Sequence, residues 1–275
     1  MYSYHLAQWL LFFYFYSFCG WVWESCFVSV KERHWINRGF MHGPHLPIYG
    51  TGAVVILFLT LPVRGNYVLI YILGMTGATI LEYVTGVAME RLFHMRYWDY
   101  SEKPLNFQGH ICLFSSLGWG FFSVLLVEWV HKPVESLIFS IPNTLVDVGA
   151  FVITAVFVAD LTQSFNEAMD LREILAKMTE NKERLRELEK RLERRMDVVA
   201  AVLDDDWHQL QEKTTARLHA LEERMKEQKA LRASGKDRQY LRSVRILKRN
   251  PKTSSREFAS ALKEIQNSVR NRKGK

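Results

Sequence analysis

The apolar residues of this chain form long runs over roughly its first 160 positions. A helix needs about 20 mostly apolar residues to cross the ~30 Å hydrocarbon core of a bilayer, because it rises about 1.5 Å per residue. Five runs come close to that length and carry almost no charge. They cover residues 6–30, 47–63, 67–89, 111–130 and 137–161. The pattern predicts an all-α fold, a polytopic transmembrane bundle of about five spans over residues 1–162. The second run is short, and the fifth contains Pro142 and Asp147.

The Lys and Arg residues between these runs predict the orientation of the bundle, since cytoplasmic loops retain positive charge. The N-terminus has none, and the successive connections have three, one, three and one before the basic tail. Five spans therefore place the N-terminus outside and residues 31–46, 90–110 and 163–275 in the cytoplasm. A four-span alternative, with one weak run lying in the interface, breaks this alternation.

Beyond residue 162 the pattern changes to that of a charged helix. From Leu171 to Leu210 apolar residues recur with 4,3 spacing at ten of twelve positions, which indicates a coiled coil. The predicted cytoplasmic helical region covers residues 163–234 and ends near Ser234. A helix this long is expected to pair with another copy, giving a homo-oligomer, or to fold back as a hairpin. The alternative is a single helix stabilised by i,i+4 charge pairs.

Composition explains why the average hydropathy is misleading. The 275 residues have a mean hydropathy of −0.09, a value typical of a soluble protein. Residues 1–162 carry a net charge of −2, with 8 basic and 10 acidic residues, and residues 163–275 carry +9, with 28 and 19. This contrast excludes a uniform soluble globule, a secreted disulfide-stapled domain and a wholly disordered chain.

Residues 235–275 are predicted to form a basic, partly disordered tail. Basic residues alternate there with Leu241, Val244, Ile246 and Leu247, a pattern that suits the anionic inner leaflet of the membrane. Membrane lipids are therefore the expected partners. Nucleic acid is the weaker alternative, because residues 163–275 as a whole contain 19 acidic residues and few aromatic ones.

Glu24 and Glu82 are carboxylates that lie inside apolar runs, where a charged side chain is costly and is by default a candidate for function. Glu24 comes six residues before the end of the first run, and Glu82 seven before the end of the third. The predicted topology puts both at a similar depth, roughly 10 Å inside the cytoplasmic interface, so we expect a shared pocket. The structural alternative is that each Glu bonds to a neighbouring helix or reaches toward water.

The two longer cytoplasmic loops add polar and aromatic candidates near the same interface. Gly and Pro residues impose an irregular path on the first loop, and both loops are rich in aromatic residues. An aromatic belt at headgroup level explains Trp98 and its Tyr neighbours equally well. The candidate substrate-binding residues are Glu24, His42, His45, Tyr49, Glu82, Asp99, Asn106 and His110.

The sequence points to no cofactor and to no catalytic residue. His42 and His45 are weak candidates for a divalent metal, but they lie on a Gly/Pro loop, and the chain has neither a helical HExxH nor paired CxxC motifs. P-loop, Rossmann and GxSxG motifs are also lacking. If ATP powers transport, a separate ATPase subunit must hydrolyse it.

Four separated motifs carry a family resemblance. They are the run from Gly39 to Gly52, Leu81-Glu-Tyr-Val-Thr-Gly86, Trp98-Asp-Tyr100, and Asn106 to Leu113. With Glu24, which follows Cys19-Gly-Trp-Val-Trp23, they resemble the bacterial CmpB-type membrane proteins, which are named as ABC transporter permeases. The resemblance covers roughly residues 9–135 and implies a multi-spanning protein of the bacterial cytoplasmic membrane. Its motif residues bring no assigned roles, and His110 stands where we expect Arg in the family.

Three functions fit these observations. The leading interpretation is a transporter, or a permease subunit of a transport complex, with a polar pocket near the cytoplasmic interface. The second is a membrane-embedded enzyme that acts on a lipid or cell-envelope precursor through Glu24, Glu82 and the loop histidines. The third is a membrane scaffold that acts through its coiled coil.

Overall fold

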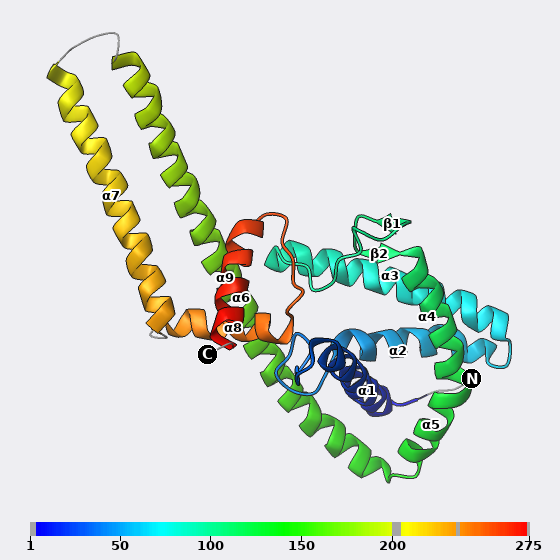
Figure 1. Ribbon diagram of the computed structural model, residues 1–275. Coiled ribbons are helices and arrows are strands. Elements are labelled where there is room, and N and C mark those ends of the chain that lie inside the picture. Colours follow the sequence, from blue (N-terminus) through cyan, green and yellow to red (C-terminus); the bar gives the residue numbers. More distant parts are fainter. Residues whose placement is uncertain (1–3, 200–204, 235–236, 274–275) are drawn as a thin grey trace. The chain divides into compact units, whose positions relative to one another are not determined.

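The computed structural model describes residues 4–199, 205–234 and 237–273, and nearly all of their regular structure is helical (Figure 1). One short antiparallel hairpin pairs Asn106 with Cys112 and Phe107 with Ile111. In chain order the elements are α1 Leu6–Glu32, α2 Pro47–Thr60, η1 Leu61–Val63, α3 Tyr67–Phe93, β1 Asn106–Phe107, β2 Ile111–Cys112, α4 Leu113–Leu125, η2 Leu126–Val130, α5 His131–Phe139, α6 Asn143–Val199, α7 Asp205–Ser234, α8 Arg238–Arg249 and α9 Ala259–Lys273.

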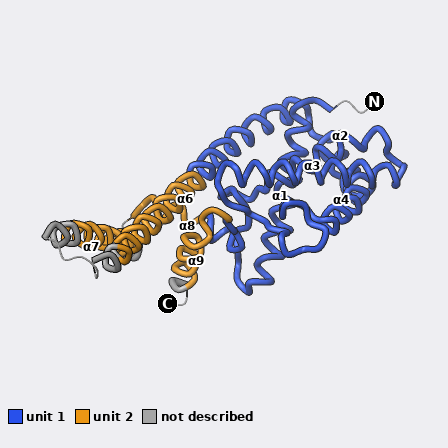
Figure 2. The backbone as a smooth tube through the Cα atoms, turned by 90° about the horizontal axis from the view of Figure 1, so that it is seen from above, with its two compact units in different colours: residues 1–166, 246–255 blue, residues 167–245, 256–275 orange. Residues whose placement is uncertain are grey.

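The chain divides into two compact units, drawn in two colours in Figure 2. Unit 1 consists of residues 1–166 together with Ile246–Ser255, and unit 2 of residues 167–245 and 256–275. Two boundaries fall inside α6 and α8, and the third lies between α8 and α9. A short stretch near the C-terminus thus belongs to the unit built from the apolar runs, which the sequence pattern does not predict.

Three helical stretches among the described residues are long and apolar enough to cross a membrane. They are Tyr67–Phe93, Leu113–Phe139 and the apolar part of Asn143–Arg191, while Pro47–Val63 is apolar but shorter. Helix α1 has 27 residues and exposes large apolar side chains such as Trp23 and Phe27. The chain is therefore a helical protein with apolar, membrane-type helices.

The fourth helical stretch continues past the predicted end at residue 130. A π turn, η2, joins α4 to α5, and the connection to α6 lies at residues 140–142. Pro133 has no backbone N–H to donate, and the wider π turn directly before it interrupts the regular helical hydrogen bonding. The helix ends at Phe139, and Pro142 disfavours a helical conformation in the residue before it, so the last apolar helix begins at Asn143 rather than at residue 137.

Glycines let the helices of unit 1 approach one another closely, as small residues do in membrane helix bundles. A Cβ at Gly20 of α1 would lie 2.3 Å from the Tyr49 ring on α2, and one at Gly74 of α3 would lie 2.2 Å from Ser123 on α4. These contacts order α1, α2, α3 and α4 around one apolar core, in which Phe12, Leu57, Ile70 and Val127 are fully buried.

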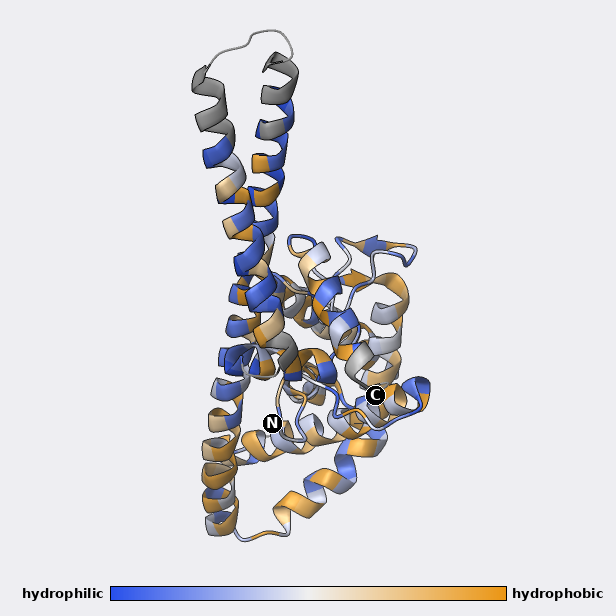
Figure 3. Cartoon of the chain, turned by 60° about the vertical axis from the view of Figure 1, so that its left-hand side comes forward, coloured by the Kyte–Doolittle hydropathy of each residue, from blue (hydrophilic) through white to orange (hydrophobic). Residues whose placement is uncertain are grey.

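Unit 2 consists of charged helices that share a smaller apolar core. Helices α6 and α7 run side by side (Figure 1), and Leu188 of one lines the same groove as Leu221 of the other. Their paired stretches are mostly hydrophilic, whereas the first part of α6 is hydrophobic (Figure 3). The buried apolar residues of this core are Ala168, Leu171, Ile174, Leu175, Met178, Tyr240, Val244, Phe258, Ala261, Leu262 and Ile265.

Two predictions for the tail meet different outcomes. The predicted coiled-coil positions beyond Val199 include residues 200–204, which lie outside the described residues, and the coiled coil itself stays a prediction. The tail from residue 235 onward is predicted to be partly disordered, and the structure differs from this expectation in that most of residues 237–273 form α8 and α9. The reason is that the apolar face of α9 packs into the core of unit 2, with Ile265 only 2% exposed.

Candidate functional site

Glu24 lies on the last third of α1 and contacts two other elements. Its Oε1 accepts a 2.7 Å hydrogen bond from the Tyr49 hydroxyl on α2. Its Oε2 lies 3.8 Å from Nε of Arg38, which is on the loop after α1. That separation is an ion pair but is longer than a hydrogen bond. Glu24 is thus held firmly by Tyr49 and loosely by Arg38.

Local sequence explains why Tyr49 reaches Glu24. Pro47 occupies the first turn of α2, where its missing N–H costs nothing and its fixed φ favours the helix. Gly20 provides the space in which the Tyr49 ring lies against α1. Gly39 has a φ of 131°, which L side chains rarely adopt, and lets the loop turn back toward α2.

Glu82 on α3 is 6% exposed and receives three hydrogen bonds of 3.0 Å. The Tyr100 hydroxyl donates to Oε1, and both Ser115 Oγ and Trp119 Nε1 donate to Oε2. Burial, followed by the nearby Glu82 carboxylate, raises the pKa of Tyr100, which therefore remains a protonated donor. Three donors on one carboxylate offset much of the cost of its burial among apolar helices.

An aromatic pair lies between the two carboxylates. The ring centroids of Tyr49 and Trp119 are 6.0 Å apart and cross at 65°. Tyr49 donates to Glu24, and Trp119 donates to Glu82. The structure therefore brings Glu24, Tyr49 and Glu82 into one continuous group, although the two carboxylates share no direct hydrogen bond that the structure records.

His42 and His45 lie apart from that group, against the part of α6 that carries Phe157 and Asp160. The Asp160 carboxylate accepts from the backbone N–H groups of His42, at 3.2 Å, and Gly43, at 2.8 Å, and lies 3.1 Å from His42 Nδ1. Burial lowers the pKa of His45, and the nearby Asp160 carboxylate offsets part of this decrease. Asp160 thereby fastens the first loop to α6.

Asp99 and Asn106 shape the second loop. Asp99 Oδ1 accepts from the backbone and the hydroxyl of Ser101, and Asn106 Oδ1 accepts from the backbone N–H of Gly109. Burial alone raises the pKa of Asp99, but hydrogen bonds from Ser101 and Ser254 outweigh it and lower the pKa overall. These contacts are those of turn-forming residues.

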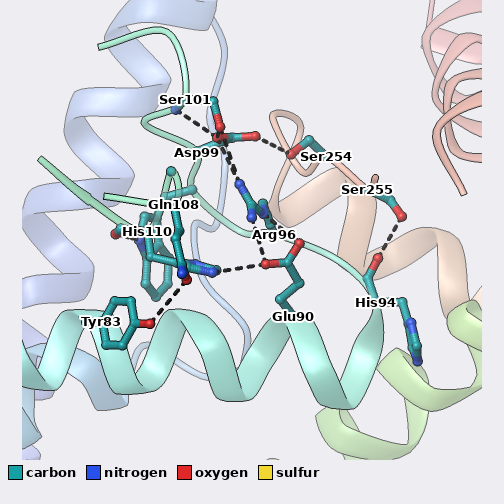
Figure 4. Close-up of polar contacts among 12 residues, drawn as sticks. Tyr83, Glu90, His94, Arg96, Asp99, Ser101, Gln108, His110, Ser254 and Ser255 are labelled. Atoms are coloured by element: carbon teal, nitrogen blue, oxygen red, sulfur yellow. Dashed lines mark hydrogen bonds and ion pairs between the residues drawn. The ribbon is translucent and has the colours of Figure 1, made fainter. Parts of the chain in front are cut away.

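His110 follows the second loop and is 4% exposed. Its Nε2 lies 3.0 Å from Glu90 Oε2, and Glu90 also accepts two 2.8 Å hydrogen bonds from Arg96 (Figure 4). The hydrogen bonds to Glu90 raise the pKa of Arg96, so the guanidinium stays charged. His110 thus belongs to a Glu90–Arg96 cluster at the end of α3.

The eight predicted candidates therefore form three groups. Glu24, Tyr49 and Glu82 form the first, His42 and His45 the second, and Asp99, Asn106 and His110 belong to the second loop. Within the part of the chain that the structure describes, no cluster of three or more His, Cys, Asp or Glu side chains could hold a metal ion.

Sequence reasoning missed the partners that complete the first group. Ser115 and Trp119 are four residues apart and therefore lie on the same face of α4. This spacing is the signal in the sequence that could have identified them as a pair. The sequence analysis used Arg38 only as one of the positive charges that predict the orientation of the helices. Asp160 was visible as a carboxylate at the end of an apolar run, the same signal that singles out Glu24.

A second polar group, also missed, lies around α5. His131 is fully buried, with Nδ1 2.9 Å from the Tyr16 hydroxyl and Nε2 3.2 Å from the Tyr4 hydroxyl. Tyr4 donates to Glu135, which also pairs with Arg64 at 3.3 Å. The sequence placed His131 and Glu135 in a connection between spans, and so did not predict that they are buried.

A comparison with models of protein families identifies the family of this chain. The model described as "Putative ABC-transporter type IV", of the CmpB type, matches residues 11–165, more than half of the chain. The chain belongs to the CmpB family. This confirms the resemblance carried by the four motifs, and the CmpB match includes Glu24, Tyr49 and Glu82. Neither the curated proteins nor the solved structures gave a match.

Proposed function

We propose that this CmpB-family chain is a transporter or the permease subunit of a transport complex, with its polar site formed by Glu24, Arg38, Tyr49 and Glu82. The observation that carries the proposal is the Glu24–Tyr49–Trp119–Glu82 group within apolar helices. Ionisable residues at such a depth are costly and mark substrate or ion pathways. Family membership supports the transport class.

The two carboxylates differ in how readily they can exchange partners. Glu82 is saturated by three donors, so it fixes α3 against α4 and the second loop. Glu24 has one strong donor and one guanidinium at 3.8 Å. A polar or cationic substrate group can therefore bind Glu24 without breaking a hydrogen bond between Glu24 and Arg38. We assign direct substrate contact to Glu24 and the support of the site to Glu82.

The remaining candidates take part in different ways. His42 and His45 border the first loop next to Asp160, and a divalent metal there would need ligands beyond these residues. Asp99, Asn106 and His110 hold the second loop, whose Tyr100 reaches Glu82. In this proposal they shape the site without contacting the substrate.

The proposed topology has five spans in the bacterial cytoplasmic membrane, with the N-terminus outside and the helical tail inside. The basic residues of the connections support it. Reporter fusions that fluoresce only in the cytoplasm and others active only outside, placed after residues 5 and 275, test the two ends. A reporter after residue 65 that is active in the cytoplasm would contradict the assignment of five spans.

The proposed partners are a separate ATPase subunit, a second copy of the chain and membrane lipids. The transporter family name supports the ATPase, and the paired α6 and α7 offer a surface on which helices of another copy could pack. Copurification of an ATPase with the tagged full-length chain from its native membrane tests the first. Light scattering in detergent measures the mass of the purified protein and so tests whether a second copy is bound.

The decisive experiment compares Glu24→Gln and Glu82→Gln in the full-length chain. We expect Glu24→Gln to abolish complementation of a strain that lacks the chain while membrane insertion stays at the wild-type level. Glu102→Gln, in the exposed part of the second loop, is the control and should complement fully. Equal loss of insertion in both site variants would make the carboxylates structural and contradict the proposal.

The same strains separate the alternative functions. Accumulation of an unprocessed lipid or envelope precursor in the Glu24→Gln strain would favour the membrane enzyme over the transporter. Full complementation by Glu24→Gln, with loss only after helix-breaking substitutions in residues 171–193, would favour the scaffold.

A further inference from the structure

A ten-residue segment near the C-terminus, Ile246–Ser255, belongs to unit 1 although it is far from that unit in sequence. It lies outside the family match, which ends at residue 165. Ile246 is 1% exposed and Asn250 is 2% exposed. The segment is thus packed into the unit and is not laid across its surface.

The segment binds the first loop through side-chain bonds to main-chain oxygens. Asn250 Nδ2 donates to the carbonyl of Gly39 at 2.7 Å, and Arg249 Nη2 donates to that of Phe40 at 3.1 Å. Asn250 Nδ2 also donates to the Ile246 carbonyl at 3.1 Å, which closes the end of α8. The amide therefore fixes the loop and the segment at once.

The segment also binds the second loop. Arg96 and Ser254 form an antiparallel bridge, with backbone hydrogen bonds of 2.8 and 3.0 Å in the two directions. Ser254 Oγ donates to Asp99 at 3.0 Å, and Ser255 Oγ donates to the His94 carbonyl at 2.6 Å (Figure 4). One segment thus holds together the two loops that border the candidate site.

Arg38 is the point at which this segment meets the site. Its Nη1 donates to Asn250 Oδ1 at 2.7 Å, its Nη2 to the Tyr97 carbonyl at 3.2 Å, and its Nε faces Glu24 at 3.8 Å. Asn250 makes the shortest of the three contacts. The guanidinium is planar, so fixing Nη1 and Nη2 also fixes the direction in which Nε points.

We propose that Asn250 is a positioning residue, which holds Arg38 at the loose ion-pair distance from Glu24 and makes the Ile246–Ser255 segment part of the site. An amide suits this position because it offers an acceptor to the guanidinium and donors to the Gly39 and Ile246 carbonyls. Without Asn250, Arg38 loses its shortest contact and can turn toward solvent. That Arg38 serves a substrate site rests on the proposed function, but its placement by Asn250 does not.

The test measures the reaction of Arg38 with phenylglyoxal, an arginine-specific reagent, in the full-length chain in bilayer nanodiscs. Mass spectrometry follows the modification rate of Arg38, with the exposed Arg33 as internal reference. We expect Asn250→Ala to raise the Arg38 rate at least threefold relative to Arg33. Asn250→Asp keeps the acceptor for Nη1 but loses the donors to the Gly39 and Ile246 carbonyls, so its Arg38 rate should lie between those of the wild type and Asn250→Ala.

The matched control is Ser255→Ala, which removes an anchor of the same segment that does not touch Arg38. It should leave the Arg38 rate unchanged. An unchanged rate in Asn250→Ala overturns the proposal, and so does an equal rise in Ser255→Ala, which would mean that the segment only fastens the loops. A rate in Asn250→Asp as high as in Asn250→Ala also overturns it.

Complementation by the same variants tests the link to function. If Arg38 serves the site, Asn250→Ala should reduce complementation while Ser255→Ala retains it. A raised labelling rate with full complementation would uphold the placement of Arg38 by Asn250 and contradict its role in the proposed function.

Discussion

The Tyr49 hydroxyl donates a 2.7 Å hydrogen bond to Glu24 Oε1 and so ties α2 to α1 at the depth of the candidate site. The bond joins residues 25 positions apart across the irregular first loop. It is also the strong contact of a carboxylate whose other partner, Arg38, stands at 3.8 Å. Whatever displaces Arg38 leaves Glu24 still oriented by Tyr49.

Removing that hydroxyl should destabilise unit 1 without changing its packing. We expect Tyr49→Phe to lower the free energy of unfolding by about 1.5–3 kcal/mol, the range for a hydrogen bond to a charged group. Thermal unfolding in detergent measures it. Tyr67→Phe, at an exposed ring, is the control and should shift the midpoint little. If Tyr49→Phe costs as much in a Glu24→Leu background, which has no acceptor at this position, as it does alone, the bond does not carry the effect.

The close approach of α1 and α2 depends on Gly20. A Cβ there would lie 2.3 Å from Cγ of the Tyr49 ring, so Gly20→Ala forces the helices apart or displaces Tyr49. We expect a loss of about 1–3 kcal/mol, as for overpacked cores. Gly118→Ala in α4, where the added Cβ meets nothing within 4 Å, should be neutral or slightly stabilising. Equal midpoints for the two variants in thermal unfolding would contradict this packing.

Asp160 and Asp147 on α6 form a matched pair of carboxylates. Asp160 accepts two backbone N–H bonds from the first loop, whereas Asp147 is exposed. We expect Asp160→Asn to destabilise by about 1–3 kcal/mol, because its amide group faces donors, and Asp147→Asn to change stability by less than about 0.5 kcal/mol. Limited proteolysis between residues 33 and 46 should accelerate only in Asp160→Asn. Equal cleavage in both variants would exclude a fastening role for Asp160.

His45 should make stability depend on pH. Burial lowers its pKa below the value of about 6.5 expected in the unfolded chain. The unfolded state therefore binds more protons, and the His45 contribution to stability is lost as the pH falls through about 6.5 toward the folded pKa. Thermal midpoints between about pH 7.5 and about pH 5 should fall less steeply in His45→Asn than in the wild type. Parallel profiles would show that His45 is not the group responsible.

Much of the helical content could be predicted from sequence because apolar runs and helical spacing are local properties. The runs at 47–63 and 67–89 correspond closely to helices, and the break at Ser234 is where α7 ends. The connection predicted after residue 130 lies instead at residues 140–142. Hydropathy alone does not distinguish a polar loop from a helix that buries a polar residue such as His131. The tail helix α9 was missed because its apolar face is stable only against another helix.

The candidate site shows the same division. Glu24 and Glu82 stood out because a carboxylate in an apolar run is costly wherever that run packs. Their connection through Tyr49 and Trp119 depends on how α1, α2, α3 and α4 pack, which no single run encodes. His42, Asp99 and His110 shared a predicted side of the membrane, yet His42 belongs to the Asp160 cluster, whereas Asp99 and His110 belong to the Arg96 cluster.

The sequence by itself determined that apolar helices precede a charged helical tail, that two carboxylates lie within those helices, and that the chain is related to the CmpB proteins. These follow from the order of residues, because the cost of placing a side chain in an apolar surrounding depends first on its own chemistry. Only the tertiary structure decided that Trp119 links Tyr49 to Glu82 and that Asn250 reaches Arg38, 212 positions away. Hydrogen bonds act over about 3 Å, so distant partners are set by packing and not by position in the chain.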